Sequence, residues 1–95
     1  MPFELCYHYD VAAEDIPRIP SNLHRRIAKA IESRLARAPH QYGSPLRKTL
    51  HGYWKLRVGD YRVVYKIDGN EVWILGIQHR KTVYQDIAQR LGESE

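Results

Sequence analysis

The stretch YWKLRVGDYRVVYKIDGNEVWILGIQ, residues 53–78, decides the fold. It contains three short runs rich in β-branched and aromatic residues, which predict strands: YWKLRV (53–58), YRVVYKI (61–67) and EVWILGIQ (71–78). Gly59-Asp60 separates the first two runs and Asp68-Gly69-Asn70 the last two. Such links are typical of hairpins because glycine tolerates a positive φ. Links this short make neighbouring strands antiparallel, so we expect a three-stranded meander.

Two segments that precede this stretch also have clear periodicity. In FELCYHY (3–9), apolar and aromatic residues alternate with more polar ones, which predicts a strand. In SNLHRRIAKAIESRLARAP (21–39), apolar residues recur every four positions and predict an amphipathic helix: Leu23, Ile27, Ile31 and Leu35. Ser21 or Asn22 is placed to cap this helix, and Pro39 to end it.

The remaining segments complete the order of elements. Residues 10–20 favour a short helix that prolines interrupt, residues 40–52 a loop with a turn, and TVYQDIAQRLG (82–92) a short C-terminal helix. This order is typical of an α+β protein, with an N-terminal strand and a helical hairpin packed on one face of a mainly antiparallel four-stranded sheet. We expect the other face to be free and partly polar, and residues 1–95 to form a single domain.

Positive charge is concentrated in the middle of the chain. The net charge is +4, but residues 18–66 contain twelve Lys or Arg and only two acids, Glu32 and Asp60. A basic region of this kind is typical of a nucleic-acid-binding protein or of a protein with an acidic partner. The alternative is a solvated basic helix face without a partner.

Composition disfavours several other classes of protein. A single cysteine, Cys6, permits no intrachain disulfide, the first ten residues do not resemble a signal peptide, and no apolar stretch has the length of a membrane span. We therefore expect a cytoplasmic protein with no membrane partner. The five histidines lack metal-site spacing and the glycines form no phosphate-binding loop, so we expect neither a metal nor a cofactor.

The basic residues suit a reaction that needs neither a metal nor a protein nucleophile. In RNA, the 2′-hydroxyl can attack the adjacent phosphodiester if a base takes its proton, cations stabilise the charge at phosphorus, and an acid protonates the departing 5′-oxygen. Arginine suits the cationic role because its guanidinium forks onto two phosphate oxygens. The candidate residues, including aromatic rings for base stacking, are Arg62, Arg80, Tyr84, Lys55, Arg57, Tyr53, Trp54 and Tyr61.

Structural explanations for the same residues stay open. Arg62 also fits a cross-strand salt bridge, Arg80 a strand-end cation, and Tyr84 a core position. With a two-residue loop in the second hairpin, strict alternation places Arg62 and Arg80 on opposite faces of the sheet. A three-residue loop places them on one face. If Arg80 lies beyond the last hydrogen bond of the ladder, alternation does not determine its face.

The segment WKLRVGDYRVVYKIDGNEVWILGIQHRKTVY (54–84) resembles the core of the RelE/ParE superfamily of bacterial toxins, on its RelE side. The most specific matches are LRVGDYRVVY and HRKTVY, and the order of elements matches over nearly the whole chain. The resemblance implies a RelE-like fold and a ribosome-dependent mRNA interferase. Such an endoribonuclease cuts the codon in the ribosomal A site and leaves a 2′,3′-cyclic phosphate and a 5′-hydroxyl.

The resemblance also implies partners and residue roles. The partners are the ribosome with its mRNA and a cognate RelB-like antitoxin, whose acidic amphipathic segment blocks the toxin and through which the complex binds operator DNA. By position, Arg62 holds the scissile phosphate, and Arg80 stabilises charge or protonates the leaving group. Tyr84 orients the substrate or transfers a proton, and Lys55 matches a family lysine. The expected RNA-binding residues are Arg57, Tyr53, His79, Lys81 and Lys48.

Departures from the family pattern keep alternatives open. Tyr53 stands where some active members have a lysine, and the general base is Lys55, Tyr84 or His79. Free lysine and tyrosine have a pKa of about 10, so either one needs a depressed pKa to act near neutral pH. The same fold also serves ParE-type toxins that inhibit DNA gyrase, and a degenerate toxin acting only as a co-repressor is a third alternative.

Overall fold

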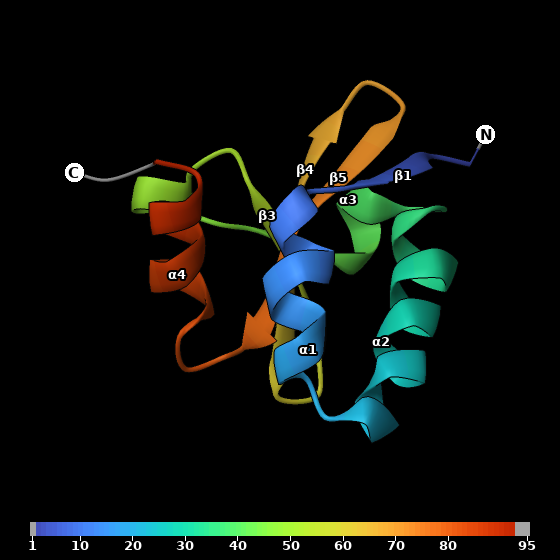
Figure 1. The fold of residues 1–95 in the computed structure, drawn as a ribbon. Coiled ribbons are helices and arrows are strands. Elements are labelled where there is room, and N and C mark those ends of the chain that lie inside the picture. The colour runs from blue at the N-terminus through green and yellow to red at the C-terminus, as the bar shows by residue number, and fades with distance from the viewer. Residues whose placement is uncertain (1, 93–95) are drawn as a thin grey trace.

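A five-stranded sheet forms the centre of the computed structural model, which describes residues 2–92 (Figure 1). The strands lie in the order β1 (Glu4–Tyr7), β5 (Glu71–His79), β4 (Tyr61–Asp68), β3 (Trp54–Val58) and β2 (Ser44–Pro45). β1 pairs with β5 in parallel, and the other neighbouring strands are antiparallel. The α+β class and the meander are confirmed. The expected number of four strands is wrong, because the segment taken as a loop contributes the two-residue edge strand β2, a position where proline is tolerated.

The N-terminal helical hairpin covers one face of this sheet. Its first arm comprises η1 (Val11–Asp15) and α1 (Ile16–Arg18), and its second arm comprises η2 (Ser21–Leu23), α2 (His24–Ala30) and η3 (Ile31–Leu35). The predicted apolar stripe is buried, with Ile27, Ile31 and Leu35 at most 3 % exposed. The expected side-chain cap at Ser21 or Asn22 is not formed. Instead, Nε2 of His24 lies 2.8 Å from the carbonyl oxygen of Ile19 and ties the two arms together.

The core between the hairpin and the sheet is built from one side of each central strand. Its sheet residues are Leu56, Val58, Val63, Tyr65, Val72, Ile74 and Ile77. The hydroxyl of Tyr65 donates a 2.7 Å hydrogen bond to the carbonyl oxygen of Pro39, at the start of α3 (Pro39–Tyr42). Burial raises the pKa of Tyr65, so this phenol acts as a structural donor.

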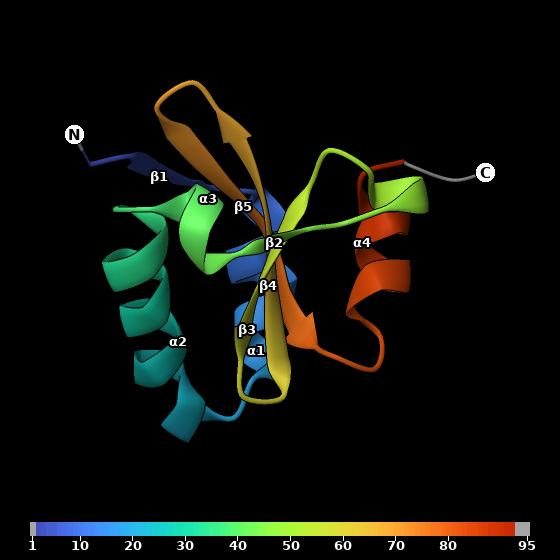
Figure 2. The ribbon, with the colours of Figure 1, turned by 180° about the vertical axis from the view of Figure 1, so that it is seen from behind.

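The opposite face of the sheet is partly covered, and the expectation that it is free is wrong. The helix α4 (Val83–Arg90) and the turn η4 (Lys48–Leu50) pack on it in a second apolar cluster of Leu50, Val64, Val83 and Ile87. Figures 1 and 2 show α2 and α4 on opposite sides of the sheet. Val64 gives this face of the sheet an apolar position, on which the predicted apolar stripe of α4 is buried. Within residues 2–92, no helix has both the length and the apolar character of a membrane span.

A bulge in β5 sets the register of the second hairpin. The loop between β4 and β5 has two residues, Gly69-Asn70. Further along, β5 contains an extra residue, Leu75, which has no partner in β4. This bulge reverses the parity of the residues that follow, so that Arg62 lies opposite Gln78 and shares a face with Arg80 by register. The two-residue loop therefore gives the arrangement that strict alternation allowed only for a three-residue loop.

A buried ion pair joins the two helical layers around the edge of the sheet. Asp15 in η1 is 1 % exposed, and Arg90 near the end of α4 binds it through two nitrogen–oxygen contacts of 2.8 Å. Asp15 also accepts hydrogen bonds from the backbone nitrogen of Ile77 (2.9 Å) and from Nε2 of Gln78 (3.0 Å). These β5 residues lie beyond the part that pairs with β1. The hydrogen bond to Asp15 raises the pKa of Arg90.

Candidate functional site

The main candidate side chains gather on the face of the sheet that α4 covers. Lys55 of β3 lies opposite Val64 of β4, and Arg57 lies opposite Arg62. Val64 packs against α4. Because side chains alternate between the two faces of a strand, Lys55, Arg57 and Arg62 lie on the same face as Val64, which is the face that α4 covers. Tyr84, in the first turn of α4, packs against the same apolar cluster.

Arg62 folds back onto the turn between β3 and β4. Its Nη1 donates hydrogen bonds to the carbonyl oxygens of Gly59 and Tyr61, both at 3.0 Å. A guanidinium carries five N–H donors, and in the part of the chain that the structure describes this one makes no other hydrogen bond. Nε and Nη2 of Arg62 are therefore available to an anion.

Arg80 meets the same turn from the end of β5. Its backbone nitrogen donates a 2.8 Å hydrogen bond to the carbonyl oxygen of Asp60, and its Nε lies 3.6 Å from Oδ1 of that residue. The two side chains are 55 % and 73 % exposed. Exposed ion pairs contribute little, so a phosphate can replace the carboxylate at modest cost. Arg62 and Arg80 thus converge on Gly59-Asp60.

Lys55 and Tyr84 form a second pair on this face. The Nζ atom of Lys55 lies over the ring of Tyr84, 5.7 Å from its centroid, in a cation–π contact. Both side chains are half-buried. The contact holds an amine and a phenol together at the junction of β3 and α4, where the two arginines are on the same face.

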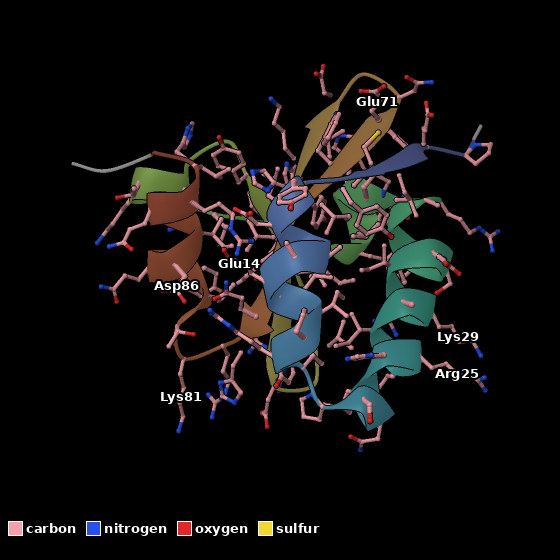
Figure 3. All side chains as sticks on the ribbon, viewed as in Figure 1. Glu14, Arg25, Lys29, Glu71, Lys81 and Asp86 are labelled. Atoms are coloured by element: carbon pink, nitrogen blue, oxygen red, sulfur yellow. The ribbon has the colours of Figure 1, made fainter. Side chains whose placement is uncertain are left out.

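The other expected RNA-binding residues are spread around this face. Arg57 is exposed beside Arg62, and Tyr53 is half-buried against the α4 cluster. Lys48 is exposed in η4, with a left-handed backbone of φ 56°. Lys81 is exposed and extends into solvent from the turn before α4 (Figure 3). These residues surround the site rather than entering it.

His79 lies on the other face. It pairs with Tyr61, and the two rings meet edge to face with centroids 5.5 Å apart, beside the hairpin core. Nδ1 of His79 accepts a 3.2 Å hydrogen bond from the backbone nitrogen of Lys81, so its neutral ring carries the proton on Nε2. The structure brings Lys55 and Tyr84 together and leaves His79 apart from them.

Three residues next to the site were missed by sequence reasoning: Gln78, Asp15 and Arg90. Gln78 is 8 % exposed, lies opposite Arg62 and binds Asp15, which in turn binds Arg90. A signal for Asp15 was present, because it shares an i, i+4 stripe with two apolar residues, Val11 and Ile19. An acid in such a stripe indicates a buried partner.

The arrangement supplies cations, a phenol and an amine on one face of the sheet. In residues 2–92, no three His, Cys, Asp or Glu side chains are grouped so that they could hold a metal ion. This face therefore offers cations that can bind and polarise an anion, and proton donors and acceptors on the same face. A phosphodiester is an anion that such a site fits.

The chain is similar to a family of toxins. The family described as "ParE toxin of type II toxin-antitoxin system, parDE" matches residues 10–84. The sequence is 37% identical over 84 residues to Toxin RelE of Mycobacterium tuberculosis, covering 83% of this chain and 87% of that protein. It is 33% identical over 76 residues to Toxin RelG of the same organism, covering 78% of this chain and 87% of the relative.

Solved structures agree with these sequence matches. The crystal structure of the toxin-antitoxin complex RelBE2 from M. tuberculosis superposes with a TM-score of 0.77 at 29% identity, covering 84% of this chain and 93% of that chain. A mutant of E. coli toxin RelE in the free state gives a TM-score of 0.72 at 18% identity, over 95% and 98% of the two chains. The second likeness concerns the fold alone.

Proposed function

This chain belongs to the RelE/ParE superfamily of toxins of type II toxin–antitoxin systems, and on that premise we propose that it is a ribosome-dependent endoribonuclease that cuts mRNA in the ribosomal A site. The observation that carries the proposal is the convergence of Arg62 and Arg80 on the Gly59-Asp60 turn. Two guanidinium groups on one face, with a lysine and a tyrosine on the same face, match the needs of phosphodiester cleavage by the RNA itself.

The proposed reaction uses the 2′-hydroxyl of the substrate as its nucleophile. A base removes the 2′-proton, the 2′-oxygen forms a bond to phosphorus, and the bond from phosphorus to the 5′-oxygen breaks. An acid then supplies a proton to that 5′-oxygen, which leaves a 2′,3′-cyclic phosphate and a 5′-hydroxyl. Arg62 holds the phosphate through its open N–H groups, and Arg80 stabilises the developing charge or protonates the leaving group.

Lys55 and Tyr84 are the preferred candidates for the general base. Their contact, with Nζ 5.7 Å from the ring centroid, puts both groups on the face of the two arginines. His79 is disfavoured in this role because its strand position turns it toward the hairpin core. A general base must reach the proton that it removes, so geometry comes before basicity in this choice.

Primer extension on a defined mRNA, with and without translating ribosomes, tests the proposal. The purified protein is expected to cut within A-site codons only when ribosomes are present. Arg62→Ala and Arg80→Ala are each expected to abolish the cuts. Lys66→Ala is the matched control, because Lys66 is an exposed base on the same strand and the same face as Arg62. Normal cutting by either arginine variant would refute the assignment.

A cognate antitoxin is the proposed partner. The relative of known structure with 29% identity was crystallised as a toxin-antitoxin complex. The basic middle of the chain, +10 over residues 18–66, offers charge complementarity to an acidic amphipathic segment. Operator binding by the complex, through the antitoxin, is part of the same proposal.

Gyrase inhibition is the second candidate, since the matching family carries the ParE description. The arginine and tyrosine set argues for RNA chemistry. A DNA supercoiling assay with gyrase separates the two: inhibition by the wild type, together with no cuts in mRNA, would favour the ParE-type activity. A folded protein inactive in both assays would favour a degenerate toxin that acts as a co-repressor.

A further inference from the structure

A basic pocket lies on the hairpin side of the sheet and extends to Gly59 in the β3–β4 turn. It has a volume of about 280 Å³ and opens to solvent between α2, η3 and the end of β3. Its charged lining consists of Arg26, Lys29 and Arg34 of the hairpin, together with Arg57 at the edge of β3, whose side chain has the α4 face by alternation. Ser33 and Gly59 complete the polar wall.

In the part of the chain that the structure describes, the four cations of this pocket have no acidic partner, and Arg34 lies over the ring of Tyr42, 5.9 Å from its centroid. None of the ion pairs formed within residues 2–92 includes Arg26, Lys29, Arg34 or Arg57. The one acid in the second arm of the hairpin, Glu32, acts elsewhere: burial, with a contribution from Glu32, raises the pKa of Tyr7. Like charges close together repel one another, so an external anion bound among them would relieve this repulsion.

The backbone of β3 contributes to the same pocket. β2 covers only the first two residues of β3, so the later residues have an open edge. The carbonyl oxygen of Tyr53 accepts a hydrogen bond from the nitrogen of Leu46 on the β2 side. By alternation the N–H and C=O of Arg57 also point to that side, where no strand follows. The open edge therefore adds an N–H donor to the side-chain cations.

The pocket and the proposed catalytic set meet at one turn. Gly59 accepts a hydrogen bond from Arg62 on the α4 side. On the hairpin side, a Cβ placed on Gly59 would lie only 3.3 Å from Nη1 of Arg26. Arg57 lines the pocket and lies opposite Arg62 in the ladder. A polyanion that crosses the tip of the β3–β4 hairpin can contact both sides.

We propose that this pocket binds backbone phosphates of RNA, as a second site beside the Arg62–Arg80 centre. The inference rests on the proposed function, because it gives the substrate a continued path across the hairpin. Phosphate fits better than a protein segment, since the lining offers arginine forks and a free N–H but only two small apolar residues, Ala30 and Val58. One RNA strand then contacts Arg62 and Arg80 on one side of the turn and the pocket on the other.

Salt titration of RNA binding tests the proposal. The probe is a 2′-O-methylated RNA oligonucleotide, which cannot be cleaved by its own 2′-oxygen. The pocket variant is Arg26→Gln/Lys29→Gln, and the matched control is Arg25→Gln/Arg37→Gln. The control removes the same charge from exposed positions outside the pocket (Figure 3 labels Arg25 and Lys29). Each lost phosphate contact lowers the slope of log K against log salt by about 0.7, so the pocket variant is expected to lose about 1.4 and the control almost nothing.

A second arm of the experiment replaces the oligonucleotide with purified ribosomes. Weaker binding of the pocket variant to both probes identifies single-stranded RNA as the source of the phosphates, and weaker binding to ribosomes alone identifies ribosomal RNA. Equal slopes and affinities for the pocket variant and its control, with both probes, would overturn the proposal. So would a variant that keeps its RNA affinity and loses only antitoxin binding. The cleavage assay with Arg62→Ala is separate, so failure of the proposed function is seen independently of the pocket.

Discussion

Ile87 on α4 occupies the space that a side chain on Gly76 of β5 would fill. A Cβ built on Gly76 would overlap Cδ1 of Ile87, which is itself fully buried. The absence of a side chain at this point of the sheet lets α4 approach the backbone closely. The packing of α4 on the sheet, and with it the position of Tyr84, therefore depends on Gly76.

Gly76→Ala is expected to destabilise the protein by about 1–3 kcal/mol, because overpacking forces α4 or β5 to shift. Urea denaturation measures the loss. Ile87→Ala alone leaves a cavity and also destabilises, but Gly76→Ala/Ile87→Ala should cost clearly less than the sum of the two single changes. Additive costs would mean that the two residues do not compete for the same space.

The buried pair of Asp15 and Arg90 gives a second prediction. Asp15→Ala is expected to destabilise the protein by about 3–5 kcal/mol, because the buried Arg90 guanidinium keeps only Asp10 as an acidic partner, 3.5 Å from its Nε, and the N–H of Ile77 and the amide of Gln78 lose their acceptor. The double change Asp15→Leu/Arg90→Met removes both charges and should be much less harmful than Asp15→Ala. Thermal denaturation measures both. An equal loss for the single and double changes would argue against an uncompensated charge as the cause.

The buried phenol of Tyr65 is expected to lower the free energy of unfolding at alkaline pH. Its pKa is raised by burial, so at high pH the folded state keeps the proton while the unfolded state loses it above about pH 10. The contribution of the neutral phenol to the free energy of unfolding is fully present below about pH 10. It is lost as the pH rises further, by at most about 1.4 kcal/mol per pH unit. Unfolding free energies measured by urea between pH 7 and pH 11 test this. Tyr65→Phe should fall less steeply, and identical slopes would contradict the prediction.

Substitutions at the proposed general base separate the three candidates. Of Lys55→Gln and Tyr84→Phe, the variant that removes the general base is expected to lower the single-turnover rate of mRNA cleavage on ribosomes by about 10²–10⁴-fold, the usual effect of such a loss. Tyr84→Phe keeps the ring under Lys55, so it tests the hydroxyl and leaves the packing intact. His79→Gln is expected to cleave at close to the wild-type rate. A large loss for His79→Gln with normal rates for the other two would reverse the assignment.

Removal of the negative charge of Asp60 is expected to strengthen RNA binding. The carboxylate of Asp60 competes with phosphate for Arg80, at 3.6 Å from its Nε. Asp60→Asn keeps the size of the turn residue and removes the charge, and the exposed pair contributes little to stability. Binding of the 2′-O-methylated oligonucleotide at low salt measures the gain. An unchanged affinity would mean that Arg80 does not contact phosphate in the complex.

Periodicity was sufficient to predict most of the fold. Ile27, Ile31 and Leu35 are buried as their spacing requires, and the Gly69-Asn70 link forms the hairpin that its residue types favour. Local patterns could not reveal β2, because a two-residue edge strand has no period. They also missed the cover on the α4 face, which depends on how the last helix folds back onto Val64.

The candidate site was predicted in composition and only partly in geometry. Arg62 and Arg80 share a face because of the bulge at Leu75. Gly76, which directly follows Leu75, is the one residue in the run EVWILGIQ that indicates an irregular strand there, because a glycine inside a strand often marks a bulge. The same register sends His79 to the other side. The pairing of Asp15 with Arg90 joins positions at opposite ends of the chain, and the choice between several acids and bases is made by tertiary packing.

The place of β5 in the sheet has a consequence for the timing of toxicity. Of the five strands this one is made last, yet it lies between β1 and β4 and joins β1 to the antiparallel strands. A nascent chain that ends before β5 cannot close the sheet, and Tyr84 follows β5 in synthesis. The proposed catalytic set thus assembles only after β5 and the first turn of α4 have been synthesised, so a nascent chain that stops earlier lacks it.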